Sequence, residues 1–150
     1  MNIKTSSKLP ERELRYLAEA MLRAIVSGET LPGRDEPIRF PDLAFVLNQP
    51  NVIVVNENLP GFPASLKLSK PVQIVPRQLL QQQARKAGDV TYLQFRPPQV
   101  KGDTVQLTLE AKIAAADPHR PSLGLSGLQV TFKKVGGKWL ALNEGRSFAA

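Results

Sequence analysis

The feature that most constrains the fold is a strict two-residue alternation of apolar and polar side chains across residues 104–114, TVQLTLEAKIA. The apolar set is Val105, Leu107, Leu109, Ala111 and Ile113. The polar set is Gln106, Thr108, Glu110 and Lys112. Because successive strand residues point to opposite faces, this pattern predicts a strand with one face on a core and the other toward water. Such strands are typical of antiparallel sheets, so we expect an antiparallel sheet to make up most of the chain after Gly88.

The stretch VTFKKVGGKWLAL, from Val130 to Leu142, predicts a hairpin with a defined register. Two adjacent glycines between apolar runs favour a two-residue turn, because such turns need positive φ. The expected pairs are Val135 with Lys138, Lys134 with Trp139, Lys133 with Leu140, and Phe132 with Ala141. The Lys134 stem would then cover the Trp139 indole while its ammonium group stays in water. We interpret the stretch as the end of a sheet, with Val130, Phe132 and Trp139 on its core side, rather than as a recognition site.

Two amphipathic helices are predicted. Residues 11–27 carry one apolar stripe, made of Leu14, Leu17, Ala18, Met21, Leu22 and Ile25. Pro10 suits the start of this helix and Gly28 its end. Residues 77–87, between Pro76 and Gly88, carry a narrower stripe of Leu79, Leu80, Ala84 and Ala87.

The region between the helices is less regular. Residues 52–55, VIVV, are consecutive β-branched residues, which predicts a strand covered on both faces. An irregular connection precedes it, with a short turn of helix or strand near 43–47, and Leu66 with Leu68 suggests an edge strand. Residues 97–103, PPQVKGD, predict a turn. The topology of residues 30–70 stays open.

These elements predict an α+β fold in which an N-terminal helix and a second helix pack on a curved antiparallel sheet of about four to six strands. The 150 residues fit a single domain, 1–150. We expect residues 1–8 and 146–150 to be flexible.

Composition excludes several kinds of chemistry. Cysteine is absent and His119 is the single histidine, so thiol catalysis, disulfides, and multi-cysteine or multi-histidine metal sites are ruled out. There is no P-loop, dinucleotide fingerprint or nucleophile elbow. We expect no metal and no cofactor. No segment resembles a secretion signal or spans a bilayer, so we expect a cytoplasmic protein that does not associate with a membrane.

The net charge of +7 is concentrated after Glu57, where thirteen Lys and Arg oppose five Asp and Glu. This asymmetry suggests an anion-binding surface. The candidate residues are Arg85, Lys86, Arg96, Lys101, Lys112, Lys133 and Lys134. Since no block of five or six like charges occurs, we favour the simpler interpretation that the charge keeps the domain in solution.

Candidate acid–base residues are few. Asp117 and His119 lie in the proline-bounded stretch ADPHRPS, and Tyr92 lies in a predicted strand. An aspartate and a histidine held together can transfer protons. Such a stretch is more often a surface turn, so catalysis by Asp117, His119 or Tyr92 is the weaker interpretation.

The order of a long helix, a strand, a second helix and a meander ending VTFKKVGGKWLALNE resembles the nuclear transport factor 2-like (cystatin-like) superfamily, most strongly over residues 76–144. The resemblance implies a curved sheet with helices in its concavity, a pocket and often a homodimer. Enzymes of that group place Asp, His or Tyr inside the cone, and only Tyr16, Tyr92 and His119 are available here, with no catalytic motif. Residues 30–70 depart from the pattern because they lack the further early helices.

Three hypotheses about function follow from these observations. The leading hypothesis is a non-enzymatic binding or accessory domain that holds a small molecule or a protein partner in a pocket or on a sheet face. The first alternative is a small pocket enzyme with acid–base chemistry. The second is an anion or nucleic-acid binder that uses the basic C-terminal half and therefore loses affinity as salt rises.

Overall fold

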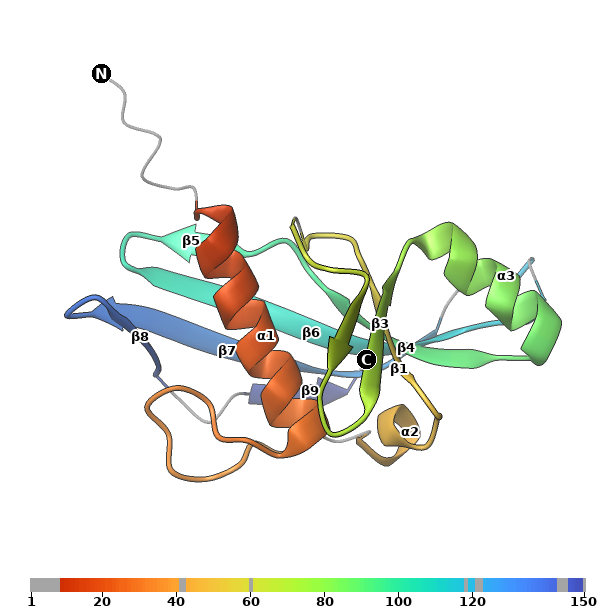
Figure 1. Ribbon diagram of the computed structural model, residues 1–150, viewed down its shortest axis with the longest axis horizontal. Helices are drawn as coiled ribbons and strands as arrows, with labels where there is room; N and C mark the ends of the chain where they lie inside the picture. The colour runs from red at the N-terminus through yellow and green to blue at the C-terminus, as the bar shows by residue number, and fades with distance from the viewer. Residues whose placement is uncertain are drawn as a thin grey trace, which may run out of the picture.

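The computed structural model describes residues 9–40, 43–59, 61–117, 119–120, 123–142 and 146–149. Within these ranges it contains three helices and nine strands (Figure 1). The helices are α1 (Glu11–Ser27), α2 (Leu43–Leu47) and α3 (Arg77–Ala87). The strands are β1 (Val52–Val55), β2 (Ser65–Lys67), β3 (Pro71–Val75), β4 (Val90–Phe95), β5 (Gln99–Lys101), β6 (Thr104–Ala114), β7 (Leu123–Val135), β8 (Lys138–Ala141) and β9 (Arg146–Ala149).

The strands form one open mixed sheet in the order β2-β3-β1-β4-β6-β7-β8, with β5 paired to β6 and β9 to β7. The expected α+β class is confirmed, but the sheet is larger than expected and not wholly antiparallel. β1 runs parallel to both β3 and β4. β3 was not predicted because Pro71 and the turn-forming residues before it interrupt the pattern of a five-residue strand in which Val72 and Ile74 are buried.

The alternation predicted for residues 104–114 is confirmed from Val105 to Ala111 of β6, whereas Ile113, expected on the same buried face, is only half-buried. Val105, Leu107, Leu109 and Ala111 are at most 1% exposed, and Thr108 is the exception on the polar side at 8%. β7 pairs with β6 along its length, with one register shift where Ala111 faces Ser126 but Lys112 faces Gly124. The extra residue in β7 is Leu125, so β7 carries a bulge there.

The final hairpin has the register expected from its glycines. Phe132 pairs with Ala141, Lys133 with Leu140, Lys134 with Trp139, and Val135 with Lys138. Gly136 and Gly137 have φ of 59° and 81°, in the left-handed region that favours glycine. The Lys134 ammonium lies 5.7 Å from the centroid of the Trp139 ring, as the cross-strand pairing implies.

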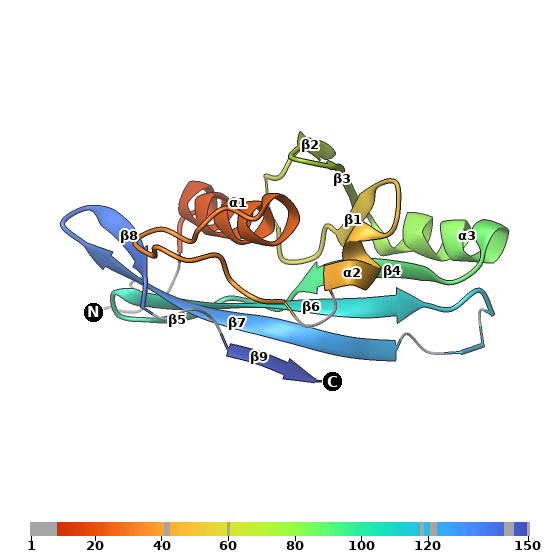
Figure 2. The ribbon, with the colours of Figure 1, turned by 90° about the horizontal axis from the view of Figure 1, so that it is seen from below.

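The two long helices lie on opposite faces of β1, which corrects the expectation that both occupy one concave side. Val52 and Val54 belong to the cluster that includes α1, whereas Ile53 and Val55 belong to the one that includes α3. In Figure 2 the strands β1, β2 and β3 rise between the two helices. A strand that is apolar on both faces can bury a helix on each, and β1 is buried at all four positions.

The helix bounds agree with the expected ones, but the stripe of α3 is narrower than expected. Leu80 and Ala84 are its buried residues. Leu79 is 48% exposed and Ala87 is also exposed, so their assignment to the buried stripe is wrong. Leu80 and Ala84 are four positions apart, about one helical turn, so the buried apolar residues of α3 span a single turn.

Two further expectations are corrected. The stretch expected to be a turn, residues 97–103, contains β5, which extends the edge of β6 occupied by β4. Residues 146–149, expected to be flexible, form β9 beside β7. The Phe148 ring lies over Gly127, where a Cβ would come within 2.2 Å of it, so this strand needs glycine at 127. Residues 1–8 and Ala150 lie outside the described residues.

Candidate functional site

Glu13 connects α1 to the final hairpin. Its Oε1 accepts hydrogen bonds from Lys134 Nζ at 2.6 Å and from Trp139 Nε1 at 3.1 Å. The hydrogen bond from Lys134 lowers the pKa of Glu13, against the opposing effect of partial burial. Glu13 is more than 120 positions from both of its partners in the chain, so these two hydrogen bonds hold the hairpin against the first turn of the helix.

A groove of about 640 Å³ opens beside this contact, between α1, the turn at residues 32–33 and the hairpin. We call it the Trp139 groove, and its lining residues are Arg12, Glu13, Tyr16, Pro32, Gly33, Gly137, Lys138, Trp139 and Leu140. An adjoining cavity of about 500 Å³ runs along α1 and shares Arg12, Tyr16, Pro32 and Gly33 with it. The groove lies within the range of about 300–1,000 Å³ that ligand pockets occupy.

A tight turn forms one wall of the groove. In Leu31-Pro32-Gly33-Arg34, the Arg34 N–H donates to the Leu31 carbonyl at 2.9 Å, and Gly33 has φ of 79°. Proline at the second position and a positive-φ glycine at the third are typical of a type II turn. The Ala141 N–H of β8 donates to the Pro32 carbonyl at 2.8 Å, which attaches the turn to the hairpin. A Cβ at Gly33 would lie 2.9 Å from Leu140 Cδ2.

The groove has an excess of positive charge. The linings of the two cavities together carry five cations, Arg12, Arg15, Arg23, Arg34 and Lys138, against the carboxylates Glu13, Glu19 and Glu29. Glu13 is paired with Lys134, and both Glu19 and Glu29 are paired with Arg23. Arg12 and Lys138 are exposed and form no ion pair or hydrogen bond with any residue in the described ranges. Glu13 attracts Arg12 only through space, as the smallest of the causes that lower the pKa of Glu13, so an anion in the groove would meet two cations without a direct carboxylate contact.

The groove also offers apolar and aromatic surface. Tyr16 is 53% exposed on the polar side of α1, Trp139 is half-buried, and Pro32 with Leu140 completes the apolar part. Among the described residues, no three His, Asp or Glu side chains gather as a metal site would require. The arrangement is suited to binding an anion that also has an apolar or aromatic part.

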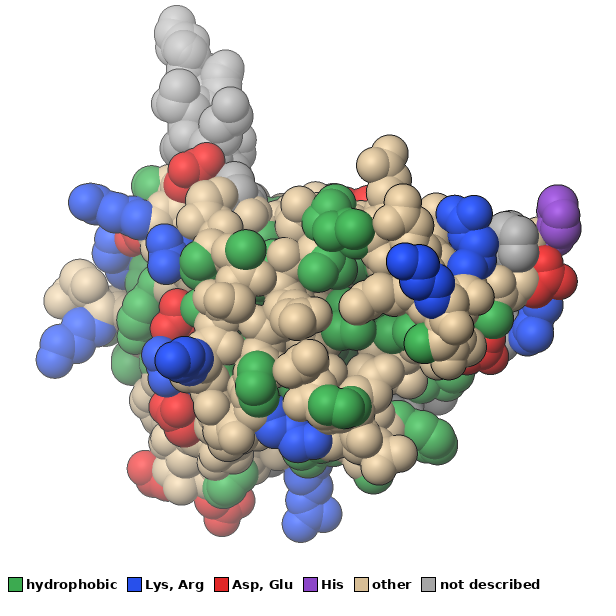
Figure 3. Space-filling view, turned by 45° about the vertical axis from the view of Figure 1, so that its right-hand side comes forward, with side chains coloured by type: hydrophobic (Ala, Val, Ile, Leu, Met, Phe, Trp, Pro, Cys, Tyr) green, Lys and Arg blue, Asp and Glu red, His purple; other side chains and the backbone are tan. Residues whose placement is uncertain are grey.

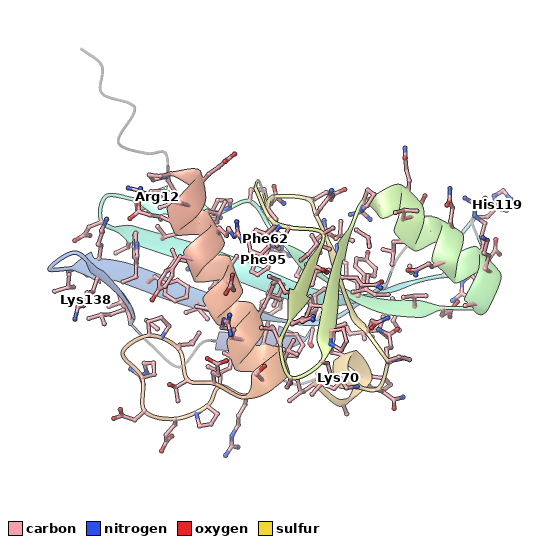
Figure 4. All side chains as sticks on the ribbon, in the orientation of Figure 1. Arg12, Phe62, Lys70, Phe95, His119 and Lys138 are labelled. Atoms are coloured by element: carbon pink, nitrogen blue, oxygen red, sulfur yellow. The ribbon has the colours of Figure 1, made fainter. Side chains whose placement is uncertain are left out.

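The acid–base candidates lie away from this groove. Asp117 Oδ1 accepts a hydrogen bond from the backbone N–H of His119 at 2.9 Å. This carboxylate therefore stabilises the turn and is not seen to orient the His119 imidazole. His119 is exposed, at the end of the molecule opposite Arg12 and Lys138 (Figure 4). Neither residue lines the Trp139 groove or the adjoining cavity.

Tyr92 is 1% exposed inside the cluster under α3, apart from both Asp117 and His119. Its hydroxyl makes no hydrogen bond to any described residue. Arg77, at the start of α3, lies near enough for this hydroxyl to help raise the arginine's pKa, although the main cause is the hydrogen bond from Arg77 to Glu57. The structure thus brings Tyr92 to an arginine and not to the other acid–base candidates.

The seven basic candidates do not form one surface, and most of them are paired. Arg96 lies 2.7 Å and Lys112 3.7 Å from carboxylate oxygens of Glu110, an ion pair that raises the pKa of Arg96. Lys133 pairs with Asp103, and Lys134 with Glu13. The other three are exposed on α3 and β5: Arg85, Lys86 and Lys101. Figure 3 shows Lys and Arg side chains dispersed among apolar and acidic ones on the face in view.

Apart from the hairpin and Tyr16, which the resemblance placed inside a cone, the residues of the groove were not among the candidates predicted from the sequence. Two signals were available. Tyr16 lies outside the apolar stripe of α1, so an aromatic ring on the helix's polar side was predictable. The sequence LPGR at 31–34 predicts a type II turn. Neither signal indicates that the turn and the helix face meet the hairpin.

Comparisons of the chain with models of protein families, with curated proteins and with solved structures found no match. No helix in the described part of the chain is long and apolar enough to cross a membrane.

Proposed function

We propose that the protein is a non-enzymatic binding domain that holds an anionic, partly apolar ligand in the Trp139 groove. The observation that carries the proposal is the position of Arg12 and Lys138, two exposed cations that form no salt bridge or hydrogen bond with the described residues, on α1 and on the hairpin that border an aromatic groove. A cation beside apolar surface selects for an anion with an apolar body, because each part contributes binding that the other cannot replace.

The relation to nuclear transport factor 2-like proteins stays a prediction, and the binding proposal does not depend on it. The pocket-enzyme alternative has less support, because Asp117, His119 and Tyr92 line neither the Trp139 groove nor the adjoining cavity. Binding of nucleic acid by the basic C-terminal half also has less support, because four of its seven basic residues are paired with carboxylates.

Trp139 provides a direct test because it is the single tryptophan and lines the groove. Benzoate and phenyl phosphate are titrated while Trp139 fluorescence is recorded, with benzyl alcohol as the uncharged probe. We expect both anions to change the emission and to bind more weakly as salt rises. Benzyl alcohol should bind at least several-fold more weakly.

Arg12→Gln and Lys138→Gln should each weaken anion binding by about 3–10-fold, the loss of one charge-assisted contact. Lys86→Gln is the matched control, since it removes one exposed charge from α3, outside the groove. If neither anion changes Trp139 fluorescence, or if the control weakens binding as much as the two groove variants do, the proposal is wrong.

A further inference from the structure

We infer that the occupant of the Trp139 groove is an extended acidic peptide segment of a partner protein, which adds a strand to the outer edge of β8. The inference rests on the proposed function and specifies the ligand class for the same groove. Its basis is the outer edge of β8, the strand whose Lys138, Trp139 and Leu140 line the groove.

The register of the hairpin determines which backbone groups face outward. The Leu142 N–H donates to the Thr131 carbonyl at 2.8 Å, toward β7. In an antiparallel pair, hydrogen-bonded and non-hydrogen-bonded positions alternate, so Leu140 and Lys138 also bond to β7. Trp139 and Ala141 therefore direct their N–H and C=O groups away from β7. The bond from the Ala141 N–H to Pro32 confirms this direction.

The outward backbone groups of Trp139 are unoccupied, in contrast to those of Ala141. Neither the N–H nor the C=O of Trp139 bonds to a residue in the described ranges. An extended peptide residue placed beside Trp139 could exchange two hydrogen bonds with it, as neighbouring strands do. At Ala141, the Pro32 carbonyl of the same chain already accepts the hydrogen bond that an added strand would accept.

Inside the sheet, β1 and β4 share one register pair, Val54 with Leu93, and side chains take up backbone groups of β4 on either side of it. Gln49 acts like a strand residue toward β4, since its Oε1 accepts from the Thr91 N–H at 3.0 Å and its Nε2 donates to the Thr91 carbonyl at 2.7 Å. Asn58 Nδ2 donates to the Phe95 carbonyl at 2.8 Å. β2, β5 and β9 also pair with one strand each, but none of their described residues borders either cavity. The edge at Trp139 is therefore distinguished by its groove.

Charge determines which strand the edge can accept. Lys138 beside an open edge is a common protection against pairing with another sheet. A second copy of this chain at β8 would bring Lys138 and Arg12 of both molecules together, and like charges facing one another are destabilising. A peptide with acidic side chains instead gains from the same two cations. Its alternate apolar side chains can contact Tyr16 and Trp139.

The test uses the full chain and two peptides, Ac-Glu-Val-Glu-Val-Glu-NH₂ and its counterpart N-methylated at the central glutamate. N-methylation removes a backbone donor and keeps every charge and apolar side chain. We expect the unmodified peptide to change Trp139 fluorescence. The methylated peptide should bind about tenfold more weakly, because it loses one hydrogen bond and its N-methyl group clashes with β8. Arg12→Gln should weaken the unmodified peptide, whereas Lys86→Gln should not.

Amide hydrogen exchange followed by NMR gives an independent result. In the free protein the Trp139 amide should exchange rapidly while those of Lys138 and Leu140 are protected by β7. Saturating peptide should protect the Trp139 amide, whereas benzoate should not. This readout depends on backbone pairing and not on where a charge is bound.

The outcomes separate the two proposals. If benzoate binds with the expected dependence on Arg12 but the peptide leaves Trp139 amide exchange unchanged, the strand-addition inference is wrong and the proposed function stands. If neither probe binds, both are wrong. If the Trp139 amide of the free protein becomes protected as protein concentration rises, a second copy occupies the edge and the inference is overturned.

Discussion

The α1 side and the α3 side of the sheet are held together by different forces. α1 buries eight residues, and its cluster extends through β1, β4, β6, β7 and β8. α3 buries two, Leu80 and Ala84, against the smaller cluster that contains Tyr92. Since hydrophobic stabilisation follows the apolar area removed from water, α1 is anchored far more strongly than α3.

Polar contacts compensate in part on the α3 side. Arg77, the first residue of α3, forms two hydrogen bonds of 2.9 Å with the Glu57 carboxylate and one of 3.1 Å with Gln94 Oε1. Gln94 Nε2 donates to Glu57 Oε1 at 2.7 Å. This network joins the start of α3 to the end of β1 and to β4. The Trp139 groove thus lies on the side of the molecule with the larger buried core, which favours a site that keeps its geometry.

The largest effect is expected from Leu17→Ala on the α1 side. Leu17 is 0% exposed, and truncating a fully buried leucine costs about 2–5 kcal/mol because a cavity replaces the lost contacts. Urea unfolding monitored by Trp139 fluorescence measures this loss. We expect the whole transition to shift, since α1 contacts most of the sheet.

A smaller and local effect is expected from Leu80→Ala on the α3 side. Its cost should fall near the lower end of the same range, about 2 kcal/mol, because α3 can shift over so small a cluster. Hydrogen exchange should show the α3 amides opening while those of α1 stay protected. Leu79→Ala is the matched control, because Leu79 is 48% exposed and its truncation should change stability by less than about 0.5 kcal/mol.

Equal losses from Leu80→Ala and Leu17→Ala, with α1 and α3 amides opening together, would show that the sheet and both helices unfold as one unit. The α1 side and the α3 side would then not differ in how strongly their helices are anchored.

Arg77→Gln should cost about 1 kcal/mol or less, since the ion pair with Glu57 is partly exposed and screened by water. The hydrogen bond from Arg77 lowers the pKa of Glu57 below its ordinary value. A lowered carboxylate pKa gives stability that is present above the ordinary value and is lost as pH falls through the folded value. Urea midpoints measured across the acid range should therefore fall less steeply for Arg77→Gln than for the wild type. Identical pH profiles would show that the pair contributes nothing.

The smallest effect is expected from Glu13→Gln on the α1 side, below about 1 kcal/mol, because hydrophobic contacts already hold the helix there. The pKa of Glu13 is lowered mainly by Lys134, so its contribution is also lost as pH falls below the ordinary carboxylate range. The NMR signal of the Trp139 indole N–H should shift in that range in the wild type and stay constant in Glu13→Gln. A wild-type signal that does not respond to acid would contradict the hydrogen bond between Glu13 and Trp139.

Local chemistry made several elements predictable. Pro10 and Gly28 bound α1, Pro76 and Gly88 bound α3, and the Gly136-Gly137 pair specifies the register of the last hairpin. Each of these depends on residues within a few positions of one another. The burial of Leu79 was predicted wrongly because periodicity shows which residues share a helix side and not how wide the surface opposite them is.

The sequence by itself determined the helices, the alternating strand at 104–114 and the hairpin, since backbone preference and side-chain period act over short distances. Only the tertiary structure decided that β3 lies parallel to β1, that α3 takes the second face of β1, and that Arg12, Gly33 and Trp139 meet in one groove. These three features join segments distant in the chain. Their partners are selected by competition for buried surface across the whole fold, which no local pattern encodes.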